Sequence, residues 1–276
     1  MMENQELKAL LTTATRAALE AGKVINEVYQ EKDFEVESKA DESPLTLADR
    51  KSHEIIIRHL KQTDYPVLSE EGRDIPYENR SQWGYFWLVD PIDGTKEFIK
   101  KNGEFTVNIA LIRQGEPILG VVFAPYVNEL YIGNELFGAY KVEGKQSEPM
   151  EFEDMDELMK KGQILPVSEK RDKLIVVASR SHLNEETQAY VEELKKKHGD
   201  AEFVSKGSSL KICMVAEGKA DVYPRFGPTM EWDTAAGHAV ALSAGFPVTQ
   251  KDEKTPLLYN KKELMNPYFI VKSGKL

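Results

Sequence analysis

Two aspartates at the end of an apolar run are the first residues whose spacing suggests chemistry. The run 85–89 is followed at once by Asp90-Pro91-Ile92-Asp93-Gly94-Thr95. A strand end holds side chains rigidly, and carboxylates three residues apart on a proline-stiffened turn can converge on a hard cation such as Mg²⁺. The carbonyl oxygen of Ile92 can add a further ligand. Taken alone, the motif also fits aspartates that only cap a turn, as Asp-Gly sequences often do.

Three further acidic sites strengthen the case for a metal centre. Glu70 and Glu71 follow the short strand-like segment 65–68, Asp49 falls in the first turn of an expected helix, and Asp233 opens a late helix. Each has an ordinary explanation, either as a solvated corner or as helix capping. Together with the Asp90 motif, they can hold metal ions, and metal ions let an acidic protein accept a phosphorylated substrate.

The elements that must position these carboxylates change character along the chain. Apolar residues recur three and four apart from Leu7 to Val28, which predicts a long helix. A second helix is expected from Thr46, a plausible cap, to about Leu60. Short β-like runs with turn residues between them then predict an antiparallel sheet. These runs cover residues 85–89, 105–112, 118–123, 129–132 and 138–142.

The second half of the chain alternates strand-like and helix-like segments, which indicates a layered α/β arrangement. The expected strands cover 174–178, 202–205, 220–223 and 268–271, and the expected helices cover 184–197, 208–217 and 233–244. Residues 143–172 are rich in charge and poor in aromatic side chains, which predicts a surface excursion at a domain boundary. We therefore expect an N-terminal α+β domain over 1–145 with the metal cluster, and a C-terminal α/β domain over 146–276 with substrate-binding groups.

The composition restricts the classes of function. The 276 residues are 41% hydrophobic and 30% charged, as in ordinary soluble proteins. No secretory signal and no apolar run of ~20 residues is found, so we expect a cytoplasmic protein, with association at the inner membrane left open. The single cysteine, Cys213, fits a reducing compartment. A formal net charge of -10 argues against nucleic-acid binding, which needs a basic face.

The combination of acidic motifs resembles the inositol monophosphatase family. The marks of that family are a Glu-Glu pair, Asp-Pro-Ile/Leu-Asp-Gly-Thr and a later Trp-Asp. Here they are Glu70-Glu71, the run from Asp90 to Thr95, and Trp232-Asp233, in matching order and spacing across essentially the whole chain. The resemblance implies a layered αβαβα sandwich and Mg²⁺-dependent, lithium-sensitive hydrolysis of phosphomonoesters with two or three metal ions.

The resemblance also implies a role for each motif residue. The metal ligands would be Glu70, Asp90, the Ile92 carbonyl, Asp93 and Asp233. Asp49 and Thr95 would orient and deprotonate the attacking water, and Glu70 is counted with them among the catalytic residues. Because two-metal sites activate a water directly, no nucleophilic serine or cysteine is expected.

Within this family, the second half of the chain resembles the 3′(2′),5′-bisphosphate nucleotidases of sulfur metabolism. The resemblance lies in the segments 178–182, 207–211 and 220–225. Paired serines at a helix start and a forked arginine are good phosphate ligands. The implied substrate-binding residues are Gly94, Thr95, His182, Ser208, Lys211, Arg225 and Asp233. The expected reaction converts adenosine 3′,5′-bisphosphate to AMP and phosphate, and 3′-phosphoadenylyl sulfate is a further candidate substrate.

Other functions stay open at this point. An inositol monophosphatase would share the metal cluster but bind a polyol. A fructose bisphosphatase has no sugar-specific signal here, and a non-catalytic metal or nucleotide sensor would be expected to have lost part of the cluster. The sequence leaves open the number of metals at turnover, the oligomeric state and the role of residues 143–172.

Overall fold

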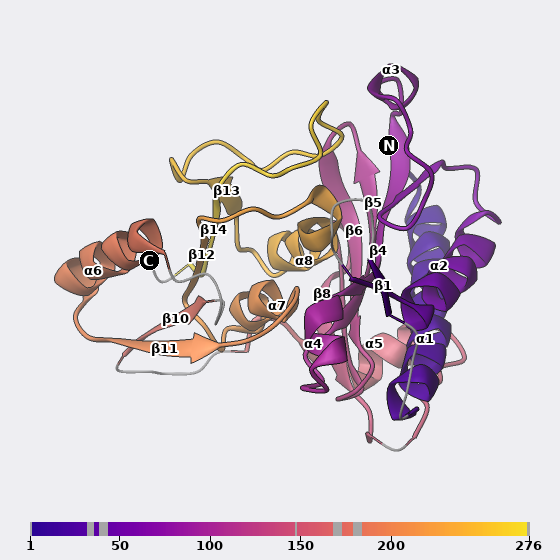
Figure 1. Cartoon of the computed structure of the whole chain (residues 1–276), viewed down its shortest axis with the longest axis horizontal. Helices are drawn as coiled ribbons and strands as arrows, with labels where there is room; N and C mark the ends of the chain where they lie inside the picture. Colours follow the sequence, from indigo (N-terminus) through magenta and orange to yellow (C-terminus); the bar gives the residue numbers. More distant parts are fainter. Residues whose placement is uncertain are drawn as a thin grey trace.

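Helices and sheets alternate in layers across the molecule (Figure 1). The computed structural model describes residues 2–31, 36–38, 44–146, 148–167, 173–178 and 184–274. From right to left in Figure 1, the helices α1 (Asn4–Gln30) and α2 (Leu47–Leu60) cover one sheet, α7 (Leu210–Glu217) and α8 (Glu231–Ser243) lie between the sheets, and α6 (Glu185–His198) covers the other. The predicted αβαβα sandwich is therefore confirmed.

The first sheet is built mainly from consecutive antiparallel strands, as predicted. Its order is β3-β4-β5-β6-β7-β8-β9, with β3 parallel to β4 and every later pair antiparallel. Because helices cover both faces, the central strands are buried along almost their whole length. The strands are β3 (Val67–Ser69), β4 (Tyr85–Asp93), β5 (Thr106–Arg113), β6 (Glu116–Ala124), β7 (Glu129–Asn134), β8 (Gly138–Glu143) and β9 (Gln163–Ile164).

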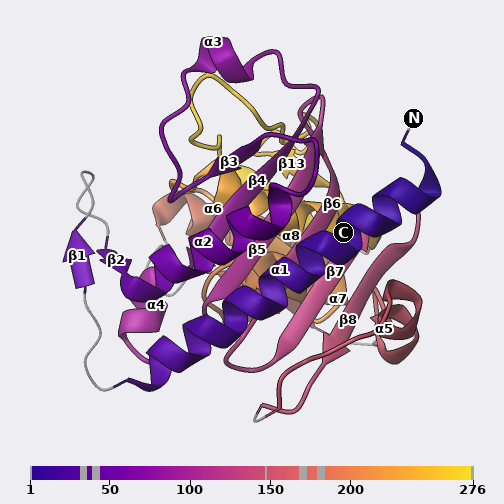
Figure 2. The ribbon, with the colours of Figure 1, turned by 90° about the vertical axis from the view of Figure 1, so that its right-hand side faces the viewer.

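The helices α1 and α2 lie side by side across this sheet (Figure 2). The predicted apolar stripe of α1 is buried, with Leu7, Leu11 and Ile25 fully enclosed. The predicted cap of α2 is also confirmed, because Thr46 and Asp49 form a reciprocal capping box. Among the described residues, no helix is both long and apolar enough to cross a membrane.

The second sheet mixes parallel and antiparallel strands. Its order is β11-β10-β12-β14-β13, and β10 is parallel to both β11 and β12. The predicted alternation of strands and helices is confirmed, and β13 is an additional strand at the edge. The strands are β10 (Leu174–Ala178), β11 (Ala201–Ser205), β12 (Val222–Arg225), β13 (Val248–Gln250) and β14 (Phe269–Lys272).

The described part of the charged region 143–172 is more ordered than its composition suggested. It contains α5 (Met155–Lys161) and β9, which extends the first sheet beyond β8. Met155 is buried, and Asp156 pairs with Lys8 of α1. The segment of α5 contains too few apolar residues to show a helical periodicity in the sequence. The sequence analysis therefore did not predict this helix. The proposed boundary at residue 145 stays a prediction.

Short elements complete the chain. They are β1 (Val36–Ser38), β2 (Pro44–Thr46), α3 (Tyr77–Arg80) and α4 (Thr95–Ile99). The strands β1 and β2 pair with each other, and α4 begins inside the Asp90 motif.

Candidate active site

The end of strand β4 carries the first two carboxylates on a β-bulge. Asp90 lies opposite Asn108 of β5, whereas Asp93 lies opposite Thr106, so β4 accommodates one extra residue. A bulge re-aims the side chains at the end of a strand, which is how two aspartates three apart can serve one site. Asp90 is buried, and its Oδ1 accepts the backbone N–H of Ile92 at 3.0 Å.

Asp49 and Thr95 lie beside each other, as the predicted water-activating pair requires. The Thr95 hydroxyl lies 3.4 Å from Asp49 Oδ1 and 3.3 Å from the carbonyl oxygen of Ile92. The other Asp49 oxygen, Oδ2, accepts the backbone N–H of Thr46 at 2.8 Å. The capping box therefore fixes Asp49 from one side and leaves Oδ1 facing Thr95.

The predicted metal-binding carboxylates influence one another electrostatically. Burial raises the pKa of Asp90 well above its ordinary value, and the negative charges of Glu70, Asp93 and Asp233 raise it further. The pKa of Asp233 is likewise raised by burial and by the neighbouring charge of Asp93. Burial raises the pKa of Asp93, while Lys211 opposes the rise. Asp90, Asp93 and Asp233 are thus held together at a cost that a bound cation would relieve.

The oxygen ligands suit a hard divalent cation, although the carboxylates are not close enough together to form a complete coordination sphere. Among the described residues, no group of three or more histidine, cysteine, aspartate or glutamate side chains converges closely enough to hold a metal. The shared electrostatic influence of Glu70, Asp90, Asp93 and Asp233 nevertheless places them in one region. Carboxylates and a backbone carbonyl are the ligands that Mg²⁺ prefers, so these residues fit such an ion.

A buried polar chain that the sequence analysis did not identify supports this cluster. The Asn108 side chain donates to Ser209 Oγ at 2.9 Å, and Ser209 Oγ donates to the Asp233 carbonyl at 2.6 Å. Hydrogen bonds from Ser209 also lower the pKa of Asp93 against the effect of burial. Thr106 in turn donates to Asn108 Oδ1 at 3.1 Å. The sequence feature that could have indicated this chain is Asn108, a polar residue inside the apolar strand 105–112.

A cavity of about 390 Å³ joins this cluster to the predicted substrate-binding residues. Its lining includes Asp93, Gly94 and Asp233 from the acidic side and Ser208, Lys211 and Arg225 from the basic side. Glu70, Asp90, Ile92, Asp49 and Thr95 do not line this cavity. His182 lies outside the described residues.

The basic side of the cavity contains polar atoms without partners. Ser208 has a positive φ of 47°, and its buried Oγ has no hydrogen-bond partner among the described residues. Arg225 donates from Nη2 to the carbonyl of Pro228 at 2.7 Å, while its buried Nε likewise has no partner in the described part of the chain. Unsatisfied buried donors of this kind are matched by an anionic ligand.

Lys211 adds a buried cation to the same side. Its Nζ donates to the Ser208 carbonyl at 2.6 Å. Burial lowers the pKa of Lys211 to about 8, although Asp93 favours the charged form. A phosphate beside Nζ would return this pKa toward its ordinary value.

Two glycines allow the acidic and basic sides to approach each other. Gly94 has a φ of 93°, and a Cβ there would lie 3.0 Å from the Glu104 carbonyl oxygen and 3.4 Å from Ser208 Cβ. A Cβ on Gly207 would lie 2.8 Å from the same carbonyl oxygen. The motif loop and the loop before α7 therefore meet at positions where a side chain would not fit.

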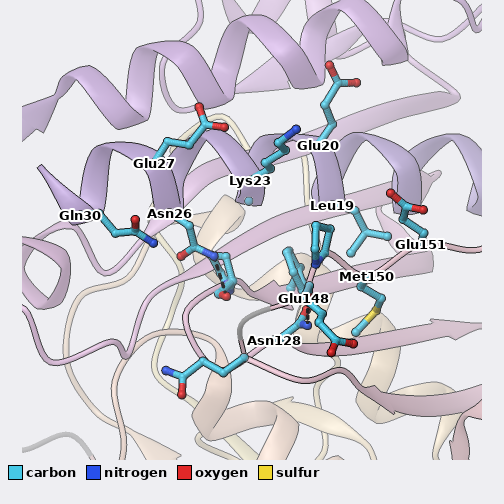
Figure 3. A pocket seen from close by; sticks show the side chains of 15 residues that line it. Leu19, Glu20, Lys23, Asn26, Glu27, Gln30, Asn128, Glu148, Met150 and Glu151 are labelled. Carbon is cyan, nitrogen blue, oxygen red and sulfur yellow. Dashed lines mark hydrogen bonds between the residues drawn. The ribbon is translucent and has the colours of Figure 1, made fainter.

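A second cavity, of about 370 Å³, lies far from these residues along α1 (Figure 3). Glu27 and Lys23 of α1 and Glu151 of the segment before α5 are among its lining residues. None of the predicted site residues lines it. Since the acidic cluster, the orphaned donors and the buried lysine all gather elsewhere, the cavity beside Asp93 and Lys211 is the candidate active site.

Comparisons with known proteins show which family the chain belongs to. The sequence pattern of the inositol monophosphatase family matches residues 6–275. The chain is 48% identical to the "3'(2'),5'-bisphosphate nucleotidase CysQ" of Escherichia coli (strain K12) over 95% of this chain and 99% of that protein. The protein of the same name from Salmonella typhimurium is 46% identical over the same shares of both chains.

A solved structure shows the same likeness in three dimensions. The crystal structure of CysQ from Bacteroides thetaiotaomicron, described as a bacterial member of the inositol monophosphatase family, is 51% identical with a TM-score of 0.89. The match covers 98% of this chain and 99% of that one. The chain therefore belongs to the inositol monophosphatase family.

Proposed function

We propose that the chain is a 3′(2′),5′-bisphosphate nucleotidase that hydrolyses the 3′-phosphate of adenosine 3′,5′-bisphosphate to give AMP and phosphate. The observation that carries the proposal is the pairing of two unlike sides in one cavity. One side is formed by Asp93 and Asp233, the carboxylates of the cluster that line the cavity, and the other offers the unpartnered Ser208 Oγ and Arg225 Nε. A substrate with two phosphates satisfies both sides at once. The near full-length identity to proteins named for this activity supports the same conclusion.

The acidic side would hold the reacting phosphate. Glu70, Asp90, the Ile92 carbonyl, Asp93 and Asp233 would bind two or three Mg²⁺ ions, which neutralise the phosphate and lower the pKa of a bound water. Asp49 Oδ1 accepts the proton of the Thr95 hydroxyl, and that hydroxyl in turn accepts a proton from the attacking water. Thr46 keeps Asp49 oriented through its backbone N–H.

The basic side would hold the other phosphate and so determine which phosphate ester the protein accepts as substrate. Ser208 Oγ and Arg225 Nε donate to the 5′-phosphate, and Lys211 Nζ adds a charge-assisted hydrogen bond. Gly94 lets the substrate approach the backbone closely. His182 is expected to contact the nucleotide. The sulfated nucleotide 3′-phosphoadenylyl sulfate would place its 5′ substituent in the same position. The protein is expected to act in the cytoplasm and to be inhibited by Li⁺.

The competing activity is that of an inositol monophosphatase, which would use the acidic side alone. Phosphate release should be measured from adenosine 3′,5′-bisphosphate, inositol 1-phosphate and fructose 1,6-bisphosphate, with Mg²⁺ and with or without Li⁺. We expect the highest kcat/KM for the bisphosphate nucleotide. We also expect Li⁺ to abolish phosphate release from it. An inositol phosphate turned over as fast as the nucleotide would refute the proposal.

A further inference from the structure

A third cavity lies beside a buried histidine that the proposed reaction does not use. It has a volume of about 620 Å³ and lies between the later turns of α8, the turns that follow β5 and β7, and the segment 247–258. Ile118, Leu242 and Leu257 form part of its apolar wall. At 1.5 Å per residue, the nine helical steps from Asp233 to Leu242 span about 14 Å, so this cavity is separate from the candidate active site.

The hydrogen bonds of His238 leave one ring nitrogen free. Nδ1 lies 2.8 Å from the Tyr259 hydroxyl, and that hydroxyl donates to Thr234 Oγ1 at 3.3 Å. Thr234 has already given its own proton to the Glu231 carbonyl, so it can only accept from Tyr259. With this arrangement of hydroxyl protons, Nδ1 donates to Tyr259, and Nε2 is the unprotonated acceptor of the ring. Within the described part of the chain, Nε2 has no partner.

A free donor lies close by on the neighbouring sheet. Asn134 Oδ1 accepts the backbone N–H groups of Leu136 and Phe137, each at 2.9 Å. Its Nδ2 has no hydrogen-bond partner among the described residues. A Cβ on the preceding Gly133 would lie 2.7 Å from Val240 Cα, which shows how tightly this end of β7 packs on α8. Donor and acceptor thus come from elements in direct contact.

The two residues with free polar atoms are buried beside the cavity. His238 is 2% exposed and Asn134 is 1% exposed, and both residues line the cavity, which is the open space available to them. Burial lowers the pKa of His238 to about 3, so the ring is neutral. At the cavity mouth, Arg113 and Glu135 neutralise each other through two hydrogen bonds of 2.6 and 2.8 Å. The buried side chains of the site therefore offer apolar walls, one acceptor and one donor, and its charged lining residues, Arg113, Glu116, Glu135 and Lys254, sum to no net charge.

We propose that this cavity binds a small neutral molecule that carries a carboxamide or lactam group. The N–H of the ligand donates to His238 Nε2, its carbonyl accepts from Asn134 Nδ2, and its apolar ring packs against Leu242 and Leu257. A charged ligand is disfavoured because the charged lining residues are equally divided between the two signs, so no net charge compensates its desolvation. A mostly apolar pocket with a few convergent polar groups is the ordinary form of a small-molecule site. The proposal does not depend on the proposed phosphatase activity.

Benzamide is the probe that tests the site. Its complex with the full chain should be crystallised, and its Kd should be measured by calorimetry. Asn134→Asp keeps the acceptor for the two backbone N–H groups and removes the donor. His238→Asn keeps a donor toward Tyr259 and removes the Nε2 acceptor. We expect benzamide in the cavity with its amide on these two residues, and a Kd at least about tenfold weaker in each variant.

Ser208→Ala separates this proposal from the proposed function, because it should weaken nucleotide turnover and leave benzamide binding unchanged. Circular dichroism melts establish which variants fold, and two independent substitutions keep the test decisive if one does not. Absence of benzamide from the cavity would overturn the proposal. So would folded Asn134→Asp or His238→Asn variants that bind benzamide with the wild-type Kd.

Discussion

The helix α8 carries Asp233 in its first turn and His238 in its middle, and the surroundings of these two ionisable side chains differ. Asp233 is surrounded by other carboxylates, and burial and Asp93 raise its pKa. His238 is surrounded by neutral groups and hydrogen bonds to Tyr259 at 2.8 Å, and burial alone lowers its pKa to about 3. Both shifts disfavour the charged form.

The difference between the two groups shows what marks the candidate active site. Burial of an ionisable side chain is shared by both, so it does not distinguish them. The charges of the neighbouring side chains distinguish the two groups. The like charges around Asp233 are offset only in part by Arg225 and would be balanced by an added cation, whereas His238 loses nothing by staying neutral. The predictions below test this contrast and extend it to the basic side of the cavity.

The largest effect is expected at the first turn of α8. Asp233→Asn keeps the acceptor for the Met230 N–H but removes the charge that would hold a metal ion. Turnover of adenosine 3′,5′-bisphosphate should fall about 10³-fold, the several kcal/mol that metal catalysis provides. Without metal, the free energy of unfolding should rise, because a buried like charge is gone. Phosphate release and urea unfolding in EDTA measure the two effects.

The matched control for Asp233→Asn is Asp200→Asn, at an exposed position that does not line the cavity. It should change neither turnover nor metal-free stability. Turnover by Asp233→Asn within tenfold of the wild type would contradict the proposed contrast between Asp233 and His238.

The next effect concerns the dependence of stability on pH at the middle of α8. Because the pKa of His238 is about 3 in the folded protein and about 6.5 in an unfolded chain, its neutral form stabilises the fold above pH 6.5. That contribution is lost as the pH falls, by about 3 kcal/mol between pH 7 and pH 4. In the His238→Asn variant, the free energy of unfolding should lack this part of the decrease between pH 7 and pH 4. Urea unfolding of both proteins at each pH tests it, and parallel pH profiles would contradict it.

On the basic side, Lys211→Met should act on one class of substrate only. The loss of a charge-assisted hydrogen bond to phosphate should lower kcat/KM for adenosine 3′,5′-bisphosphate by about 10- to 100-fold. Adenosine 3′-monophosphate, which lacks the second phosphate, should be affected less than about threefold. Steady-state kinetics on both substrates separate the outcomes. Equal losses on both would show that Lys211 serves the reacting phosphate instead.

The smallest effect is expected from the buried chain behind the carboxylates. Asn108→Ala removes the donor that positions Ser209 and, through it, Asp93 and Asp233. The Mn²⁺ Kd, measured by calorimetry, should weaken about tenfold, as is usual for groups that orient metal ligands. Thr106→Ser, which keeps the hydroxyl, should retain wild-type affinity. An unchanged Mn²⁺ Kd in a folded Asn108→Ala protein would show that the chain is only structural.

Much of the fold could be predicted from local patterns. The apolar stripe of α1 and the consecutive strands around residues 85–142 have periods that depend only on near neighbours. The cap at Thr46 was readable for the same reason. The helix α5 was not, because Met155 and Leu158 pack in the core that α1 shares and Asp156 pairs with Lys8, contacts between residues far apart in sequence.

The candidate site shows the same division. The motif around Asp90 and the pairing of Asp49 with Thr95 followed from motif spacing and family resemblance. The Asn108 chain and the cavity at His238 did not, because each depends on which residues face one another across elements. A polar residue in an apolar strand marks such a position but does not name its partner.

The most direct test of the central claim is to identify which phosphate leaves. Adenosine 3′,5′-bisphosphate should be followed by ³¹P NMR in the presence of Mg²⁺, with an EDTA control. If the carboxylate side holds the reacting phosphate and the basic side holds the other, the 3′-phosphate signal disappears and 5′-AMP accumulates only with metal. Accumulation of adenosine 3′-monophosphate, or release that persists in EDTA, would contradict this account.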